Sequence, residues 1–589
     1  MAQNVSEQLL QILKSAGVKR VYGVTGDALN FFVTAVEQDD EVDWIGFKHE
    51  ENAAFAAYGD AESSGNLAVC AGTVGPGALH LINGLYNAKK ERTPVVAITG
   101  QIPESKRGTN YFQEVDLSKM FDDVCAYQAI IRNVEDAPRV IQRALQIAIN
   151  ERTTVRIELS ADIAGMKAAA RDFVHPVFKS DAVLMPGDES VRKAADLINQ
   201  AKTVGILCGH GCRNAREEVI QLAQLIKAPI THTLKASDIF DHDTANVVGL
   251  TGLLGNPSGY NAVNKCELLL MLGTDFPYSE FLPHDIQIIQ VDTRAENIGN
   301  RTDITHGIHG DIKTFIQKLL PFIQEKNDAS FLEKLQTVFQ NWKKGKAEEA
   351  SPERKNEPLH PQLFAAMIHQ HASDDAIFTV ETGTSAIWAA HHISFHKGRR
   401  VFGSFNHGTM AVGFPSAMGA QFAFRDREVW AISGDGAFNM CMQDFITAVR
   451  YHLPLKILVL NNHQLSFVKL EMEEVGLTPT LEALKEVNFN FADYARLCGG
   501  EGVRVEKAED IEAAIVQAKE STKPFIIDAV VSSGEISLPP KITFEMAKGF
   551  GVSKLKEMWQ VITGNKEQLD NMKKELDAFF DNGKAEATL

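Results

Sequence analysis

The stretch Val429-Trp430-Ala431-Ile432-Ser433-Gly434-Asp435-Gly436 decides the fold class of this chain. Its first five residues form a short apolar run that ends at glycine, which is typical of a buried strand. Residues 438–451 then predict a helix, and residues 455–460 predict a second apolar strand that ends at Asn461-Asn462. We therefore predict a strand–helix–strand crossover with polar residues after both strands, where open α/β sheets bind ligands.

The polar residues at the two strand ends predict a site for a metal ion and a diphosphate. Asp435 and Asn462 offer oxygen ligands, which suit a hard cation such as Mg²⁺. Gly434 and Gly436 carry no side chain, so phosphate oxygens can approach the backbone N–H groups at the start of the helix. The alternative is two unrelated turns, because Gly-Asp-Gly is common in turns and Asn-Asn is common after strands.

Length and composition indicate a multidomain globular protein. The chain has 589 residues, of which 44% are hydrophobic and 23% charged, and this length allows about three to five domains. Its net charge of −17 argues against a nucleic-acid partner, because phosphate binding needs a basic face. The seven cysteines are odd in number and scattered, which fits reduced thiols in the cytoplasm. For Cys208-Gly-His-Gly-Cys212 we expect a strand-to-helix turn rather than a zinc site.

The sequence predicts a cytoplasmic protein, or one that binds the inner face of the cell membrane only peripherally. Residues 1–4 lead directly into an amphipathic helix without a signal peptide. No apolar run approaches the roughly 18 residues that are needed to span a bilayer.

Strands and helices alternate along the chain, which predicts an α/β protein with parallel sheets covered by helices. Two polar stretches that contain proline, residues 175–188 and 343–361, read as linkers. We therefore expect three doubly wound parallel-sheet domains and a helical tail. The predicted ranges are 1–175, 188–342 and 361–540 for the domains and 541–589 for the tail.

The first unit contains a second candidate for chemistry. A strand predicted for residues 42–47 leads through Lys48-His49-Glu50-Glu51 into an alanine-rich helix. A carboxylate beside small apolar side chains can hold a proton for delivery, whereas the alternative is that both acids only stabilise the helix start. Gly75-Pro76-Gly77 forms a predicted turn, and residues 110–114 form an aromatic loop with polar side chains.

These motifs together resemble the thiamine diphosphate-dependent 2-keto-acid enzymes over about residues 1 to 550. The motifs are Glu50, Gly75-Pro76-Gly77, Phe112-Gln113 and the pair Gly434-Asp435-Gly436 with Asn462. The resemblance implies an N-terminal pyrimidine-binding domain, in which Glu50 binds the aminopyrimidine of the cofactor and promotes its activation. It also implies a diphosphate- and Mg²⁺-binding third domain. The implied cofactor contacts there are Gly408, Thr409, Met410, Asp435, Gly436, Ala437 and Asn462, and the implied metal ligands are Asp435, Asn462 and the backbone carbonyl of Gln464.

The middle unit resembles the FAD-binding segments of the quinone-dependent pyruvate dehydrogenases, also called pyruvate oxidases. The motifs are residues 251–254, residues 273–278 and a strand that ends at Asp292, a usual place for a carboxylate that binds ribose. The resemblance continues at residues 403–408, at Phe467 and at residues 539–550. The implied FAD contacts are Thr251, Gly252, Leu253, Leu254, Thr274, Asp275, Phe276, Pro277, Tyr278 and Asp292.

The resemblance implies oxidative decarboxylation of pyruvate to acetate and CO₂. Pyruvate adds to the thiamine diphosphate, and two electrons then pass through FAD to a quinone, while the cofactors supply the chemistry. Phe112, Gln113 and Phe467 are expected to shape the substrate pocket. In this family each site lies between two subunits, so we expect a homo-oligomer, with a tetramer as the expected size.

Other activities stay open at this point. Acetolactate synthases share the Phe-Gln loop and both cofactors, but they carry Gln-Trp-Gln after the metal loop, where this chain has Phe467-Val468-Lys469-Leu470-Glu471-Met472. Phosphate-dependent pyruvate oxidases differ in a phosphate site that sequence does not report. Non-oxidative decarboxylases carry a His-His pair in place of Phe112-Gln113, and a non-catalytic scaffold would not need Glu50, Asp435 and Asn462.

Two segments depart from the family. Residues 471–490 follow the metal loop closely enough to line the pocket, so the choice of 2-keto acid stays open. After Phe550 the tail carries two apolar helical faces, which suit either contact with a membrane or packing on the subunit. The two faces comprise Val552, Leu555, Met558, Trp559 and Ile562, and Leu569, Met572, Leu576, Phe579 and Phe580.

Overall fold

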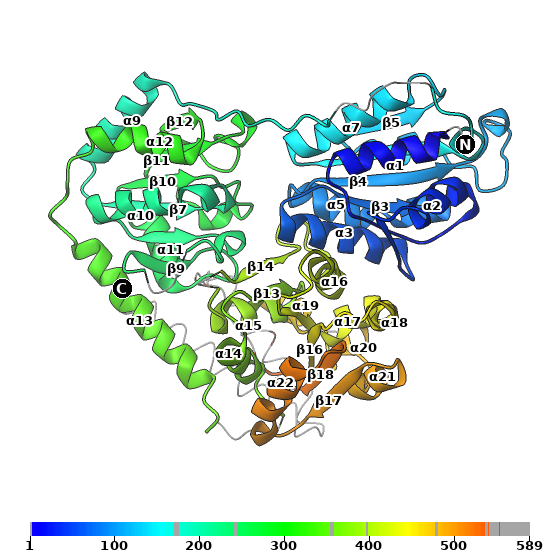
Figure 1. Ribbon diagram of the computed structural model, residues 1–589. Coiled ribbons are helices and arrows are strands. Elements are labelled where there is room, and N and C mark those ends of the chain that lie inside the picture. Colours follow the sequence, from blue (N-terminus) through cyan, green and yellow to red (C-terminus); the bar gives the residue numbers. More distant parts are fainter. Residues whose placement is uncertain are drawn as a thin grey trace.

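A computed structural model describes residues 3–169, 176–240, 244–353, 358–395, 398–477 and 481–535, together with Pro540 and Ser553. The described chain forms three six-stranded sheets whose strands all pair in parallel, each flanked by helices (Figure 1). This arrangement confirms the predicted α/β fold. The predicted tail at 541–589 lies outside the described residues apart from Ser553, so its helices and its membrane contact stay predictions.

The first sheet has the order β2-β1-β3-β4-β6-β5. Its strands are β1 Arg20–Gly23, β2 Asp43–Gly46, β3 Ala68–Gly72, β4 Val95–Gln101, β5 Tyr127–Ile131 and β6 Thr154–Ser160. The helices around it are α1 Val5–Ser15, α2 Asn30–Glu37, α3 Glu50–Ser64, α4 Pro76–His80, α5 Ile82–Lys90, α6 Leu117–Met120, α7 Ala137–Glu151 and α8 Ala161–Ala164. Every residue of β3, β4 and β6 is buried, because helices cover both faces of the sheet.

The second sheet has the order β12-β11-β10-β7-β8-β9, which from the other edge is the 3-2-1-4-5-6 order of doubly wound dinucleotide-binding folds. Its strands are β7 Val204–Cys208, β8 Ile230–His232, β9 Val247–Leu250, β10 Leu268–Leu272, β11 Gln287–Asp292 and β12 His306–His309. Its helices are α9 Asp188–Gln200, α10 Arg216–Leu225, α11 Pro257–Asn264, α12 Ile312–Leu319 and α13 Ser330–Glu349. The strand order reverses between β7 and β10, which is where such sheets open a crevice.

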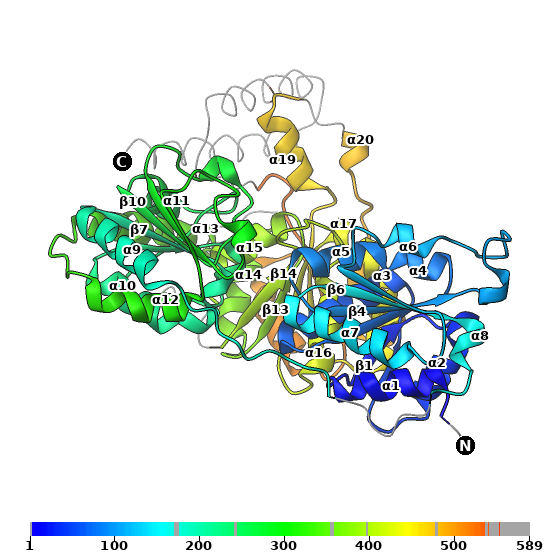
Figure 2. The same ribbon diagram turned by 90° about the horizontal axis from the view of Figure 1, so that it is seen from above.

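The third sheet has the order β14-β13-β15-β16-β18-β17. Its strands are β13 Ile377–Val380, β14 Arg400–Gly403, β15 Val429–Gly434, β16 Lys456–Asn461, β17 Glu501–Val505 and β18 Phe525–Val530. Its helices are α14 Pro361–His371, α15 Thr384–His392, α16 Gly413–Ala423, α17 Asp435–Cys441, α18 Phe445–Arg450, α19 Ser466–Glu474, α20 Leu481–Leu484, α21 Phe491–Leu497 and α22 Ile511–Glu520. Figure 2 shows α19 and α20 projecting from this domain, away from its sheet.

The helix predicted for residues 438–451 is divided in two. A 3-10 turn at Met442–Asp444 separates α17 from α18. Asp444 is fully buried there, and its carboxylate accepts hydrogen bonds from the backbone N–H of Lys48 at 2.8 Å and from Asn52 Nδ2 at 2.6 Å. These partners belong to the first domain, so a tertiary contact interrupts a helix that the local pattern predicts as continuous.

The first part of the linker predicted for residues 343–361 is helical, because α13 continues to Glu349. The buried residues of this helix, Leu332, Leu335 and Phe339, all precede residue 343 and pack beside α11. The later turns are polar and carry no apolar periodicity, so the sequence gives no signal for them. In Figure 1 this long helix leads from the second domain to the third.

The first and third domains share one core through α3 and α16. An added Cβ on Gly419 would lie 1.9 Å from the carbonyl oxygen of Ala56, and one on Gly59 would lie 2.1 Å from that of Ser416. Only glycine permits this approach of the two backbones. The contact holds the helix that begins at Glu50 against the third domain. Among the described residues, no helix is both long enough and apolar enough to cross a membrane.

Candidate functional site

The ends of β15 and β16 bring Asp435 close to the loop that contains Asn462. The two strands are neighbours, with Gly434 paired to Leu460. Asp435 Oδ2 accepts the backbone N–H of His463 at 2.6 Å, and Asn462 Oδ1 accepts the backbone N–H of Gln464 at 3.1 Å. The structure therefore places the three predicted metal ligands around one turn of the chain.

Asp435 is 2% exposed, and burial raises the pKa of its carboxyl to about 7. The backbone N–H groups of Gly436 and His463 act in the opposite direction, and the negative charge of Glu486 raises this pKa further. A bound cation would favour the charged carboxylate, because an opposite charge offsets the cost of desolvation. The oxygen ligands of this turn therefore fit a hard divalent cation.

The two asparagines after β16 have different surroundings. Asn461 is fully buried, and its Nδ2 donates to Asp528 Oδ1 at 2.9 Å. Asn462 is half-buried and its Nδ2 donates to Ser466 Oγ at 2.9 Å, within the loop that faces Asp435. Asn461 therefore has a structural role, and Asn462 is the one available to a ligand.

Only one of the two glycines beside Asp435 leaves open space. An added Cβ on Gly434 would meet no atom within 4 Å, whereas one on Gly436 would lie 2.6 Å from Leu465 Cδ2 and 3.0 Å from Glu486 Oε1. Sequence reasoning missed Glu486, which lies in the segment 471–490 that departs from the family pattern. The side chains of Leu465 and Glu486 thus occupy the Cβ side of Gly436 in this conformation, and the approach of phosphate to the backbone N–H groups stays a prediction.

In the first domain, the turn Gly75-Pro76-Gly77 lies between Glu50 and Gln113. An added Cβ would lie 2.9 Å from Glu50 Oε1 at Gly77 and 2.9 Å from the carbonyl oxygen of Gln113 at Gly75. Gly75 also has a φ of +65°, which L side chains rarely adopt. The two glycines thus let the turn approach both predicted catalytic residues.

Glu50 begins α3 and is 7% exposed. Its Oε2 lies 2.9 Å from His80 Nδ1, and the ring of His80 stacks on that of His49 with centroids 4.5 Å apart. His49 Nδ1 accepts the backbone N–H of Glu51, which places the ring proton of a neutral His49 on Nε2. His80 is therefore the hydrogen-bond partner of Glu50 and His49 packs on His80, a pair of contacts that the sequence analysis did not predict.

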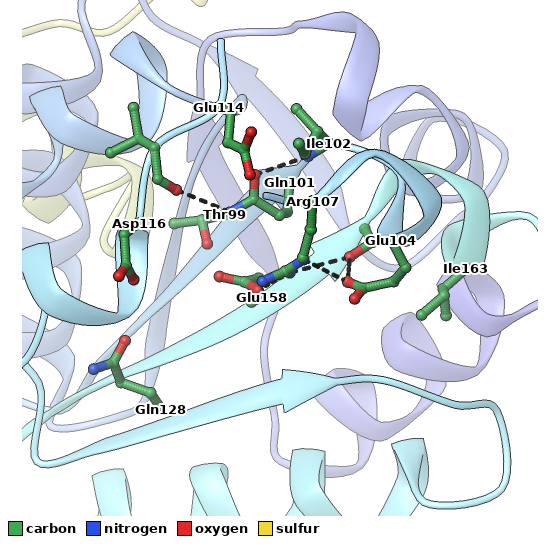
Figure 3. A network of polar contacts seen from close by, with 12 residues as sticks. Thr99, Gln101, Ile102, Glu104, Arg107, Glu114, Asp116, Gln128, Glu158 and Ile163 are labelled. Atoms are coloured by element: carbon green, nitrogen blue, oxygen red, sulfur yellow. Dashed lines mark hydrogen bonds and ion pairs between the residues drawn. The ribbon is translucent and has the colours of Figure 1, made fainter. Parts of the chain in front are cut away.

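The loop that contains Phe112 and Gln113 is exposed at its tip and anchored at its base. Phe112 is 77% exposed, and Gln113 has a φ of +63°. At the base, Arg107 forms ion pairs with Glu104 and Glu158 (Figure 3). Glu158 is 1% exposed, so this network fixes the start of the loop to the end of β6. The described chain leaves the aromatic tip without cover.

The loop that contains Gly408, Thr409 and Met410 is tied to the first domain. Asn83 Nδ2 donates to Glu51 Oε1 at 2.6 Å and to Thr409 Oγ1 at 2.9 Å. Met410 is half-buried. Among the described residues, no hydrogen bond or ion pair joins the side chains of Glu50 and Asp435. The structure therefore links the Glu50 helix to the Met410 loop, but it does not bring the two predicted cofactor ends into contact within one chain.

A cavity of about 840 Å³ lies where the strand order of the middle sheet reverses. Residues after β7 and β10, such as Gly211 and Gly273, line it, and so do Gly408 and Phe467 of the third domain. All the residues predicted to contact FAD line this cavity, namely Thr251, Gly252, Leu253, Leu254, Thr274, Asp275, Phe276, Pro277, Tyr278 and Asp292. One space thus joins the predicted nucleotide site to the loops of the third domain.

The cavity wall offers unpartnered polar groups and positive charge, both of which suit a nucleotide. The hydroxyl of Thr251 and Nδ1 of His210 are buried and have no hydrogen-bond partner in the described chain, so a polar ligand can satisfy both. Basic residues outnumber acidic ones in the lining, although the whole chain has a net charge of −17. The basic residues are Lys89, Lys90, Arg92, Arg152, Lys235, Arg294 and Arg301.

Asp275 and Asp292, the two acidic residues predicted to bind FAD, differ in how free their carboxylates are to bind a ligand. Asp275 forms ion pairs with Arg92 at 3.5 Å and with Arg301 at 3.1 Å, so its charge is matched within the protein. Asp292 ends β11, and its Oδ1 accepts the backbone N–H of Arg294 at 2.8 Å. Asp292 is therefore the better candidate for hydrogen bonds to ribose, while Asp275 positions the arginines.

Sequence reasoning also missed Glu381, which follows β13 and lines the cavity. It is 1% exposed, and burial raises the pKa of its carboxyl to about 7. The backbone N–H groups of Thr382 and Gly413 donate to it, both at 2.9 Å. The available signal was its position directly after an apolar strand, the same signal that identified Asp435.

Three models of one family match the chain in succession. They are the N-terminal TPP binding domain of thiamine pyrophosphate enzymes over residues 3–120, the central domain over 191–319 and the C-terminal TPP binding domain over 381–529. These ranges fall on the three sheets.

Curated relatives cover nearly the whole chain. A protein of Bacillus subtilis that is named as thiamine pyrophosphate-containing is 33% identical over 98% of this chain and 100% of its own length. A pyruvate oxidase of Lactiplantibacillus plantarum is 28% identical over 90% of this chain and 89% of its own. An acetolactate synthase of Mycobacterium bovis is also 28% identical, over 90% and 88%. Identity therefore does not separate these two activities.

Proposed function

Since the chain belongs to the thiamine pyrophosphate enzyme family, we propose that it oxidatively decarboxylates pyruvate to acetate and CO₂ and passes the electrons through FAD to a quinone. The observation that carries this proposal is the cavity of about 840 Å³, which joins the predicted FAD residues to Phe467 and Gly408. An electron path from a thiamine site to a flavin needs such a connection.

In the proposed reaction, one group of residues binds the cofactor and another transfers protons. Asp435, Asn462 and the carbonyl of Gln464 would hold Mg²⁺, through which the cofactor's diphosphate is anchored. Glu50, beside His80, would hold and move the proton at the aminopyrimidine. When bound, thiamine diphosphate supplies the carbanion that attacks the keto group, and FAD accepts the electrons. Phe467, which lines the cavity, would help to exclude water between the two cofactors.

The site is proposed to be shared by two copies of the chain. Phe112 is 77% exposed and Tyr111 is 45% exposed, although both belong to an anchored loop. Exposed aromatic residues of this kind mark interaction surfaces. A second copy that covers this loop would bring Gln113 and Phe112 to the pocket near Phe467, and we propose a homo-oligomer of at least two chains for this reason.

Product analysis tests the proposed reaction. The purified protein is given thiamine diphosphate, Mg²⁺ and pyruvate under argon, with and without a water-soluble quinone. We expect a yellow flavoprotein whose flavin is bleached by pyruvate, with about one acetate per flavin in the absence of the quinone and continued acetate formation only in its presence. Acetolactate as the main product would assign the chain to the carboligases, and acetyl phosphate that requires added phosphate would assign it to the phosphate-dependent oxidases.

A further inference from the structure

A short segment after the metal loop folds back on that loop. The backbone N–H of Leu465 donates to the carbonyl of Leu484 at 2.8 Å, and the N–H of Glu486 donates to the carbonyl of His463, also at 2.8 Å. These bonds flank an antiparallel bridge between Gln464 and Lys485. We name residues 484–486 the strap. Figure 2 shows that the chain reaches it through α20, which projects beyond the sheet.

The strap places the carboxylate of Glu486 beside Asp435. Glu486 Oε2 accepts a hydrogen bond from Asn439 Nδ2 at 3.2 Å, and Oε1 lies 3.0 Å from the position of an added Cβ on Gly436. The neighbouring Lys485 does not neutralise it, because its Nζ pairs with Glu482 at 2.6 Å. Glu486 therefore adds a second carboxylate next to Asp435, at the place where the diphosphate of the proposed cofactor would bind.

We propose that Glu486 is an internal competitor of the cofactor's diphosphate, so that the strap must withdraw its carboxylate from Gly436 before thiamine diphosphate is seated. The inference rests on the proposed function. Two effects act in the same direction. The carboxylate fills the space above Gly436, and it repels a phosphate anion that approaches Asp435. The backbone bonds of the strap to His463 and Leu465 hold the carboxylate in place and link its release to the metal loop.

The proposal predicts tighter and faster cofactor binding when the charge of Glu486 is removed. The variant Glu486→Gln keeps the shape of the side chain, and Glu506→Gln, an exposed glutamate of the same domain that pairs with Arg504 rather than with Lys485, is the matched control. Calorimetry and stopped-flow tryptophan fluorescence are measured with thiamine diphosphate and Mg²⁺, at low and high salt. We expect about tenfold tighter binding and faster association for Glu486→Gln at low salt. The gain should shrink at high salt, and the control should behave as wild type.

A second probe separates competition from a general change of the protein. Thiamine without phosphate lacks the anionic group that Glu486 would repel and carries only the positive charge of its thiazolium ring, so its affinity should not rise in Glu486→Gln. Equal or weaker binding of thiamine diphosphate by Glu486→Gln, with wild-type binding intact, overturns the competitor role. If neither protein binds thiamine diphosphate with Mg²⁺, the proposed function fails and this inference falls with it.

Discussion

The first and third domains have the same strand order, in which the first strand of each sheet lies beside the second and third, and the fifth strand closes the far edge. Their strand ends nevertheless carry different chemistry. In the first domain, Glu50 is beside two imidazoles and a glycine turn. In the third, Asp435 is beside backbone N–H groups, an asparagine and a second carboxylate.

The difference shows that one sheet topology can carry two kinds of site, because the residues that follow its strands differ. The first domain offers groups that exchange protons, and the third offers oxygen atoms that bind a cation. The middle domain has the dinucleotide order instead, and its crevice opens toward Phe467. Variants that lack these side chains one at a time test which domain supplies which chemistry.

Removing the carboxylate of Asp435 should have the largest effect on cofactor binding, and without bound cofactor all turnover is lost as well. Asp435→Asn is expected to weaken Mg²⁺-dependent binding of thiamine diphosphate by roughly 100-fold or more. Loss of a residue that only hydrogen-bonds to a metal ligand already lowers metal affinity about 10- to 100-fold, and Asp435 is proposed as a ligand itself. Calorimetric titration measures the affinity. Asp493→Asn, on the surface of α21, is the control. Unchanged affinity in Asp435→Asn would show that the cation binds elsewhere.

The first-domain site should affect turnover rather than binding. Glu50→Gln is expected to lower turnover of pyruvate by roughly 100- to 10,000-fold, the usual contribution of a positioned acid or base. Affinity for thiamine diphosphate should change far less. Steady-state rates and the same titration are compared with Glu41→Gln, whose side chain is exposed. Wild-type turnover in Glu50→Gln would remove the proton relay from the mechanism.

Phe467 tests the connection between the third domain and the middle domain. Phe467→Ala should slow reduction of the flavin by pyruvate by about tenfold, because reacting groups lose their fixed positions. Flavin content should stay at the wild-type level. Anaerobic stopped-flow absorbance measures the reduction, with Val468→Ala as the neighbouring control. A rate equal to wild type would place the electron path away from this side chain.

Glu381 should give the smallest effect, which is seen in the pH dependence of stability. Its pKa is raised from 4.5 to about 7 in the folded protein. The folded state therefore holds a proton that the unfolded state releases, and stability is lost as pH rises from about 4.5 to 7. Glu381→Gln should melt near wild type at pH 4.5 and above it at pH 8. Glu506→Gln serves as control, and parallel melting curves for wild type and Glu381→Gln at all pH values would contradict the buried charge.

The site residues at strand ends could be predicted from the sequence, because their positions depend on local sequence patterns. Asp435, Asn462 and Asp292 each follow an apolar strand, and parallel strands present their carboxyl ends at one edge. Glu381 follows the same rule and was overlooked. Glu486 and His80 could not be found in this way, because their partners Asn439 and Glu50 are distant in the sequence or on another element.

The sequence by itself determined the alternation of strands and helices, the three sheets and the residues at the strand ends, because periodicity and glycine placement act over a few residues. Only the tertiary structure decided where helices break and which polar groups meet. Asp444 interrupts a helix to bind the first domain, Asp275 is paired with arginines, and Glu486 closes the space above Gly436. Each depends on contacts between segments far apart in the chain, for which local patterns carry no signal.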